Sequence, residues 1–301
     1  MTPNRHITPE ERAQWASMAH VALLQCIGEA APWSPTDYAF HGGTSLHLSW
    51  NSPRFSEDLD FLLSETAGKR LKTTMLAVGE RLQQTLLVAD PPLVATIKDR
   101  STERMGNFRV TLNRPGVLGS VMVKAEFWLV PPTYLQSYQT SSRTPGVPAN
   151  LGGARVRVDT MLPAATIESA YYDKLTAFAT RSHLKWRDLF DLWWIDRQLS
   201  PETAANLCIE RLQAHLSAYN TADGLSPGDA LRRFAGMLDD RDQVADEALR
   251  DLKPFISESL WNSLWPKGID AMIELAHSRA LAVADQLDAE MSPEHAGSPA
   301  P

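Results

Sequence analysis

Apolar residues follow two different periods along the chain, and the change of period divides it into two parts. Before about residue 160, short runs alternate apolar and polar positions, which is typical of strands with one buried face. After that point apolar residues recur three and four positions apart, as in amphipathic helices. The pattern therefore predicts an α+β domain over 1–160, a helical domain over 161–290 and a flexible tail over 291–301.

The first domain is predicted to mix helices and strands. Helices are expected over 9–30, 45–50 and 66–89. Strands are expected over 38–40, 58–63, 93–98, 107–112, 120–130 and 155–159. The segment 131–153, rich in Pro, Ser, Thr and Gly, is expected to be an irregular loop. The second domain is expected to form helices over 165–182, 184–198 and 201–220, a helix that opens near Leu225, and one over 258–288.

A glycine pair lies at the start of the short helix predicted over 45–50. Gly42 and Gly43 are followed by Thr44 and Ser45. Glycines allow close approach of a phosphate, and the N–H groups at a helix start point toward an anion. The pattern predicts a phosphate-binding turn, although a Gly-Gly pair taken alone is more often an ordinary turn.

Two aspartates follow in an apolar run. Asp58 comes 15 residues after Gly43, and Asp60 shares its face of the predicted strand, as does Ser56. Neighbouring ionised carboxylates raise each other's pKa, and a divalent cation between them relieves the repulsion. Their hard oxygen ligands suit Mg²⁺. An Asp-x-Asp pair alone is usually a solvated loop or strand end, but after a glycine turn it indicates a magnesium-bound nucleoside triphosphate.

Glu126 is the one acid in the strand predicted over 120–130. Two-metal phosphoryl transfer uses a third carboxylate on the side of the nucleophile, and Glu126 is the candidate. Alternatively, Glu126 faces solvent and pairs with Lys124, which lies on the same face of the strand.

Composition and charge narrow the setting. The chain has 301 residues, 44% of them hydrophobic, and lacks a run of about 20 apolar residues or a signal-peptide pattern. The only cysteines are Cys26 and Cys208, so a disulfide scaffold is not expected. We expect the protein to reside in a reducing cytoplasm. The net charge of −7 argues against nucleic-acid binding by the whole surface. Basic residues nevertheless cluster between residues 143 and 187. This cluster is either an RNA-binding face or an ordinary solvent-exposed surface. The basic residues are Arg143, Arg155, Arg157, Lys174, Arg181, Lys185 and Arg187.

Polar residues also recur in the helices predicted over 165–198. Lys174 and Arg181 lie along one helix, and Asp188 and Asp191 share a face of the next. Patterning alone makes these exposed positions on amphipathic helices. Tryptophans 186, 193 and 194 could stack on a base but are more often part of a core.

The order of these motifs resembles a known superfamily. Gly-Gly-Thr-Ser followed by Asp-x-Asp is similar to the signature of the DNA polymerase β-like nucleotidyltransferases. The fuller string adds Arg54 and Ser56 before the aspartates, then Lys174, Arg181 and Arg187-Asp188-Leu-Phe-Asp191-Leu. This string, over residues 38–195, is similar to the AbiEii/AbiGii toxin family of toxin–antitoxin and phage-defence systems.

The resemblance implies a fold and an activity. The fold would be a mixed sheet with flanking helices, followed by a helical domain. The activity would be metal-dependent transfer of NMP from an NTP to an RNA, with the tRNA 3′ end as the best-supported acceptor and pyrophosphate released. Blocking that end would stop translation. The metal would be Mg²⁺, or Mn²⁺, and the partner an antitoxin of the transcriptional-regulator type.

The resemblance also implies roles for residues. Lys174 would reach the nucleotide phosphates, and Asp191, or else Asp188, would act as a base or position Lys174. The metal ligands would be Asp58, Asp60 and Glu126. The nucleotide and its phosphates would be bound by Gly42, Gly43, Thr44, Ser45, Arg54, Ser56, Lys174, Arg181 and Arg187.

Two other functions fit the same motifs. The enzyme could nucleotidylate a protein, in the manner of AMPylation, or a non-catalytic module could inhibit by sequestering nucleotide. The intact aspartates, Lys174 and the Arg-Asp-Leu-Phe-Asp string argue against the second.

Overall fold

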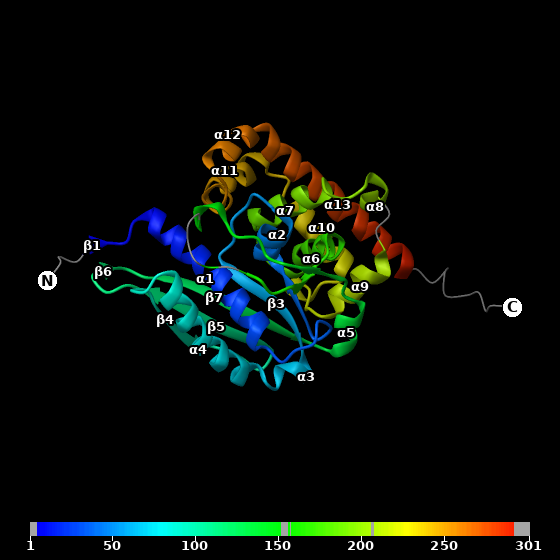
Figure 1. The fold of residues 1–301 in the computed structure, drawn as a ribbon. Coiled ribbons are helices and arrows are strands. Elements are labelled where there is room, and N and C mark those ends of the chain that lie inside the picture. The colour runs from blue at the N-terminus through cyan, green and yellow to red at the C-terminus, as the bar shows by residue number, and fades with distance from the viewer. Residues whose placement is uncertain (1–4, 152–155, 157, 206–207, 292–301) are drawn as a thin grey trace. The chain divides into compact units, whose positions relative to one another are not determined.

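The computed structural model describes residues 5–151, 156, 158–205 and 208–291. It divides into two compact units, Met1–Thr166 and Ile167–Pro301, coloured blue to green and green to red in Figure 1. The tail predicted over 291–301 lies outside the described residues, apart from Met291, where the last helix ends. The expected α+β fold, a mixed sheet with helices followed by a helical part, is confirmed.

A mixed sheet organises the first unit. Over the described residues it has seven strands in the order β4-β5-β7-β3-β2-β9-β8. β3 runs parallel to β7 and β2 parallel to β9, while the other neighbours are antiparallel. Their bounds are β2 Tyr38–His41, β3 Asp58–Ser64, β4 Val94–Asp99, β5 Met105–Asn113, β7 Val121–Val130, β8 Thr140–Arg143 and β9 Leu162–Ala165. A separate short pair joins β1 Arg5–His6 to β6 Val117–Leu118.

Helices α1 and α4 lie side by side across one face of this sheet (Figure 1). α1 begins where Thr8 accepts the N–H of Glu11 and the Glu11 carboxylate accepts the N–H of Thr8, a capping box. The helices of the unit are α1 Pro9–Ala30, α2 Gly42–Trp50, α3 Glu65–Gly68, α4 Leu71–Ala89 and α5 Pro132–Ser137, with a 3₁₀ turn at Ala149–Leu151.

Aromatic rings on the covered face hold the central strands in register. Phe61 of β3 is fully buried and stacks on Phe127 of β7, with ring centroids 4.8 Å apart. Phe40 of β2 contacts Phe61 at 5.2 Å, and these three residues are partners across the strands. Since side chains alternate along a strand, burying Phe61 turns Asp58 and Asp60 to the opposite face.

Several sequence predictions for this unit were wrong in detail. The segment expected to be an irregular loop over 131–153 contains α5 and β8. The helix expected from residue 165 begins at Ile167, because Leu162–Ala165 forms β9 between β2 and β8. The helix predicted over 66–89 is divided into α3 and α4. Such short strands depend on neighbours that no local pattern reveals.

The strand predicted over 155–159 falls partly outside the description. Arg155 and Arg157 lie outside the described residues. Val156 and Val158 are buried in the core of the first unit without belonging to a strand, and the Asp159 N–H donates to the Gln25 side chain.

The second unit consists of packed helices. α13 packs along α10 and α7, and the Phe178 and Phe234 rings stack at 4.0 Å between α6 and α10. Trp186 is buried and its Nε1 donates to the Val244 carbonyl oxygen, so it belongs to the core. The helices are α6 Ile167–Thr180, α7 Trp186–Asp196, α8 Pro201–Ala205, α9 Ile209–Ser217, α10 Pro227–Gly236, α11 Arg241–Asp251, α12 Glu258–Leu264 and α13 Lys267–Met291.

Two predicted helices of this unit are interrupted. The helix expected over 258–288 is divided into α12 and α13, and that expected over 201–220 into α8 and α9, with residues 206–207 outside the description. None of the helices described here combines the length and hydropathy needed to cross a membrane.

The buried aromatic row makes a stability prediction. Replacing Phe61 by Ala should lower the free energy of unfolding by about 3–5 kcal/mol, because it removes a fully buried ring and leaves a cavity beside Phe127. Urea denaturation followed by circular dichroism measures this. Leu76→Ala is the control: Leu76 lies on α4 at 66% exposure and should change the stability by less than about 0.5 kcal/mol.

Candidate functional site

A row of polar side chains crosses the sheet on the face opposite the aromatic row. Asp60 of β3 is the register partner of Glu126 on β7 and of His41 on β2, and Glu126 is the partner of Asn107 on β5. The Asn107 Nδ2 donates to the Glu126 Oε1 at 2.8 Å. Asp58 lies in the next row, beside Lys124. The structure thus brings the two aspartates and Glu126 to one face.

The glycine turn lies directly against this row. Gly42 follows β2, opens α2 and has a φ of 74°, a conformation that few residues other than glycine adopt. A Cβ added at Gly42 would overlap the Asp60 carboxylate. The turn and the second aspartate are therefore in contact, and only a residue without a side chain fits between them.

Arg54 and Ser56 adjoin the same turn. A Cβ at Gly43 would overlap the Arg54 guanidinium and lie 3.0 Å from the Ser56 Oγ. Arg54 is 3% exposed, and its Nη1 donates to the Phe55 carbonyl oxygen at 2.7 Å. A buried guanidinium therefore lies behind the turn and gives this edge of the site a positive charge.

The hydroxyl groups of Thr44 and Ser45 are used by the fold. Thr44 donates to the Asp58 carbonyl oxygen and Ser45 donates to the Phe40 carbonyl oxygen at 3.0 Å. Both residues are 1% exposed. These bonds hold the start of α2 against β2 and β3, so an anion at this turn would meet the backbone N–H groups of the helix start rather than these hydroxyl groups.

Lys124 lies among the carboxylates. Its Nζ donates to the Asp58 Oδ2 at 3.1 Å and lies 3.9 Å from the Glu126 Oε1. Burial acts to lower the pKa of Lys124, but the hydrogen bond that Lys124 donates to Asp58 and the charges of Asp58, Glu126 and Asp60 outweigh it and raise the pKa. Glu126 therefore does pair with Lys124, and it also stands next to Asp60 in the row.

The carboxylates suit a divalent cation whose other ligands come from a bound substrate. Among the described residues, no group of three or more His, Cys, Asp or Glu side chains is arranged to hold a metal ion. Mg²⁺ commonly takes one or two protein carboxylates and completes its shell with substrate phosphates and water. Asp58 and Asp60 offer such a pair beside the glycine turn, and Glu126 stands one strand away.

The second unit holds an ion-pair cluster between α6 and α7. The Lys174 Nζ donates to the Asp188 Oδ1 at 2.9 Å and lies 2.8 Å from the Asp191 Oδ2. Arg181 also binds Asp188. Lys174, Asp188 and Asp191 are 7%, 4% and 0% exposed, so the expectation from patterning that they are exposed was wrong.

The positive charges of this cluster keep the Asp188 carboxylate ionised. Burial acts to raise the pKa of Asp188, but the neighbouring Lys174 and Arg181 outweigh it and hold the pKa far below its usual range. Burial also lowers the pKa of Lys185, whose side chain lies at the start of α7. Lys174, buried between two aspartates, has little freedom, so the packing of α6 and α7 sets the position of its ammonium group.

The remaining predicted basic residues make structural contacts. The Arg187 guanidinium lies 4.2 Å from the Phe255 ring centroid and its Nε is 3.5 Å from the Asp251 Oδ1. The Arg143 guanidinium lies 3.9 Å from the Trp50 ring centroid. Arg155 and Arg157 are outside the described residues.

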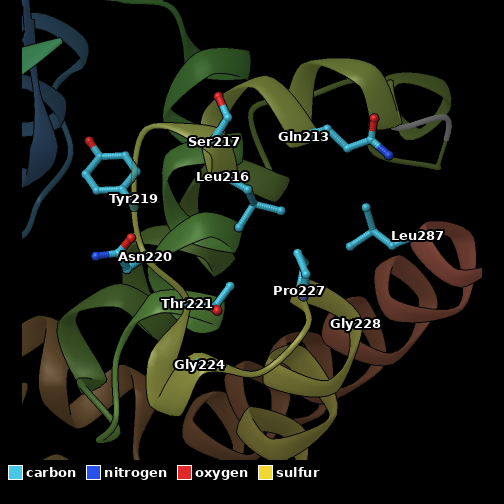
Figure 2. A pocket seen from close by; sticks show the side chains of 10 residues that line it. All are labelled: Gln213, Leu216, Ser217, Tyr219, Asn220, Thr221, Gly224, Pro227, Gly228 and Leu287. Atoms are coloured by element: carbon cyan, nitrogen blue, oxygen red, sulfur yellow. The ribbon is translucent and has the colours of Figure 1, made fainter. Parts of the chain in front are cut away.

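Each unit also has a hollow that sequence analysis did not foresee. In the first, about 360 Å³ is enclosed by the loop after α2 and the segment near Val147, and Phe55, exposed at 46%, lines it. The one local signal was an aromatic residue in an otherwise polar loop. In the second unit a hollow of about 600 Å³ lies between α9, α10 and α13, where Leu216 and Leu287 face each other (Figure 2). Its lining includes none of the predicted site residues.

Comparisons with known proteins bear on this geometry. Solved structures of similar fold include JHP933 from Helicobacter pylori, at 17% identity and a TM-score of 0.50, covering 95% of this chain and 97% of that one. Another is MenT4, a nucleotidyltransferase toxin from Mycobacterium tuberculosis, at 17% identity and a TM-score of 0.54, covering 91% of this chain and 85% of that one. No curated protein matches the sequence.

A family model supplies the assignment that these distant folds alone do not. The model for the nucleotidyl transferase AbiEii toxin of type IV toxin–antitoxin systems matches residues 29–288, which include both the aspartate row and the Lys174 cluster. The family is one of enzymes that use an NTP and a divalent metal and have an antitoxin partner. The chain therefore belongs to the AbiEii family of nucleotidyltransferase toxins.

Proposed function

We propose that this toxin transfers NMP from an NTP to an RNA acceptor in a Mg²⁺-dependent reaction, with the tRNA 3′ end as its target. The contact between the Gly42 turn and the Asp60 carboxylate is the main support, because it joins a phosphate-binding element to a metal-binding one. Blocking the 3′ end prevents aminoacylation and so arrests translation.

Residues of the first unit divide the work between them. Asp58 and Asp60, with Glu126 beside them, hold Mg²⁺, and the metal would lower the pKa of the attacking hydroxyl and stabilise charge on the phosphates. The backbone of Gly42–Ser45 binds the triphosphate, while Arg54 adds positive charge behind the turn and Ser56 flanks it. The acceptor hydroxyl would give its proton to solvent water as its oxygen bonds to the α-phosphorus, and the bond between the α-phosphorus and the pyrophosphate oxygen would break to release pyrophosphate.

In this proposal, basic residues of the second unit bind the nucleotide phosphates and offset their negative charge. Lys174 contacts the nucleotide phosphates, and Arg181 and Arg187 contribute positive charge. Contact of both Asp188 and Asp191 with the Lys174 ammonium supports a positioning role for these aspartates rather than the role of base. Asp191 is the stronger candidate, since it is the more deeply buried of the two.

The hollow beside Phe55 supports an RNA acceptor. Proteins that bind unpaired RNA stack bases on exposed aromatic rings and read their edges with polar groups. Phe55 lies 5.2 Å from the His47 ring, and burial lowers the pKa of His47, so that imidazole is neutral at pH 7. The His47 Nδ1 lies 2.7 Å from the Ser52 carbonyl oxygen and must donate there, which leaves Nε2 as an acceptor.

The proposal also defines a biological setting. The antitoxin would be of the transcriptional-regulator type, and the toxin would act in the cytoplasm, where its RNA target is found, as part of phage defence. The two alternative functions are transfer of NMP to a protein and inhibition by nucleotide binding without turnover.

The metal-binding aspartates give the first test. Asp58→Ala and Asp60→Ala should each lower nucleotide transfer by about a thousandfold or more, because loss of a metal ligand removes several kcal/mol of transition-state stabilisation. Labelling total RNA with each of the four radioactive NTPs in Mg²⁺ or Mn²⁺ measures the transfer. Glu80→Gln, an exposed change on α4, should have no effect. Retention of transfer by both aspartate variants would disprove the proposal.

The same assay distinguishes the alternatives. With bacterial lysate present, label removed by nuclease indicates an RNA acceptor, and label removed by protease indicates a protein acceptor. Binding of the NTP without any labelled product would favour the non-catalytic inhibitor.

Lys174 gives a second test. Lys174→Met should lower transfer by about 10²–10³-fold and the free energy of unfolding by about 3–5 kcal/mol, because it leaves Asp188 and Asp191 buried without the ammonium. Transfer assays on the folded protein and urea denaturation measure the two effects. Lys253→Met, which removes a lysine 39% exposed, is the matched control and should change both little. Wild-type transfer by folded Lys174→Met would leave Lys174 a structural role alone.

Phe55 tests the acceptor. Phe55→Ala should weaken RNA binding by about fivefold or more, because stacking of one base is worth about 1–3 kcal/mol, and should leave NTP affinity unchanged. Fluorescence anisotropy with a labelled single-stranded RNA measures the first and calorimetry the second. Leu87→Ala, at 52% exposure on α4, serves as the control. Equal RNA affinity of Phe55→Ala and wild type would exclude this hollow as the base site.

A further inference from the structure

Lys124 lies among the proposed metal ligands but has no role in the proposed reaction. The residue is the register partner of Asp58 on β7, one row away from Asp60 and Glu126, and its side chain shares their face of the sheet. Its Nζ is 3.1 Å from the Asp58 Oδ2 and 3.9 Å from the Glu126 Oε1. One ammonium therefore contacts two of the three carboxylates assigned to the metal.

The other cations in this row do not approach the carboxylates in the same way. The register continues from Lys124 to Arg109 on β5 and then to Lys98 on β4, and both of these side chains are exposed. Lys124 is only 30% exposed at its side chain. Among these three in-register cations, Lys124 is the one on the strand next to Asp58.

Charge balance shows why a cation at this position matters. Asp58, Asp60 and Glu126 together carry three negative charges on one face, and their mutual repulsion is unfavourable unless a positive charge lies nearby. Lys124 offsets one of them. A divalent cation that binds the same oxygens would then lie close to the ammonium and be repelled by it, in addition to competing for Asp58.

We propose that Lys124 is an internal counter-cation that stabilises the carboxylate cluster when no metal is bound and weakens its affinity for divalent cations. Binding of the metal exchanges the Lys124–Asp58 bond for a metal–Asp58 bond, and the flexible lysine stem lets the ammonium move away. The triphosphate brings negative charge that offsets the ammonium and the metal together. Tight metal binding thus depends on the nucleotide, which keeps the toxin from holding metal in its absence.

This inference rests on the proposed metal site and is tested by metal affinity rather than by turnover. Lys124→Met keeps the length of the side chain and removes its charge. Titration with Mn²⁺ alone, followed by calorimetry or by the electron paramagnetic resonance of free Mn²⁺, should show about tenfold or more tighter binding than wild type. Addition of a non-hydrolysable NTP should reduce this difference.

Thermal melting supplies an independent readout. In EDTA, Lys124→Met should melt at a lower temperature than wild type, because three carboxylates then lack their counter-cation. Saturating Mn²⁺ should raise its melting temperature by more than that of wild type. Arg109→Met, which removes the in-register cation one strand further out, is the matched control and should leave Mn²⁺ affinity unchanged. Lys124→Gln, which can still hydrogen bond to Asp58, should bind Mn²⁺ more tightly in the same way and replaces Lys124→Met if that variant does not fold.

The outcomes separate this inference from the proposed function. Equal or weaker Mn²⁺ binding by the Lys124 variants, together with loss of binding in Asp60→Ala, overturns the counter-cation role and leaves the metal site intact. An unchanged melting temperature in EDTA also overturns it. If no form binds Mn²⁺, even with NTP, the counter-cation role and the proposed metal chemistry are both overturned.

Discussion

The parallel register between β3 and β7 is the constraint on which the rest of the structure depends. It stacks Phe61 on Phe127 on the face covered by α1 and α4, and in doing so it aligns Asp60 with Glu126 on the other face. A shift of one residue would bury the carboxylates and expose the rings, at a large cost in apolar burial. The hydrophobic core therefore holds the polar row in position.

Both charged clusters have the same arrangement, with a cation held between acids. In the first unit Lys124 contacts Asp58 and Glu126, and in the second Lys174 contacts Asp188 and Asp191. Desolvation makes buried ion pairs weak contributors to stability, and apolar replacements are often as stable. Strongly perturbed carboxylates such as Asp188 are concentrated at functional sites. An enzyme that handles a polyanionic substrate needs charged groups of this kind.

Membership of the AbiEii family and the geometry of the site answer different questions. The family match identifies a nucleotidyltransferase toxin. The geometry indicates how the chain prepares for that chemistry: Gly42 leaves room for the Asp60 carboxylate, and Gly43 leaves room for the Arg54 guanidinium. Each glycine is required by the side chain of a residue more than ten positions away, so the turn and the aspartate strand form a single unit.

The sequence by itself determined the α+β class, the position of the glycine turn and the shared face of Asp58 and Asp60, because strand alternation and glycine conformation act over a few residues. It also placed the helix start at Thr8. Only the tertiary structure decided that Leu162–Ala165 is a strand, that Lys174 is buried between two aspartates and that Lys124 lies among the carboxylates. Each of these depends on which distant segments pair, and pairing across the sheet or between helices leaves no trace in local periodicity.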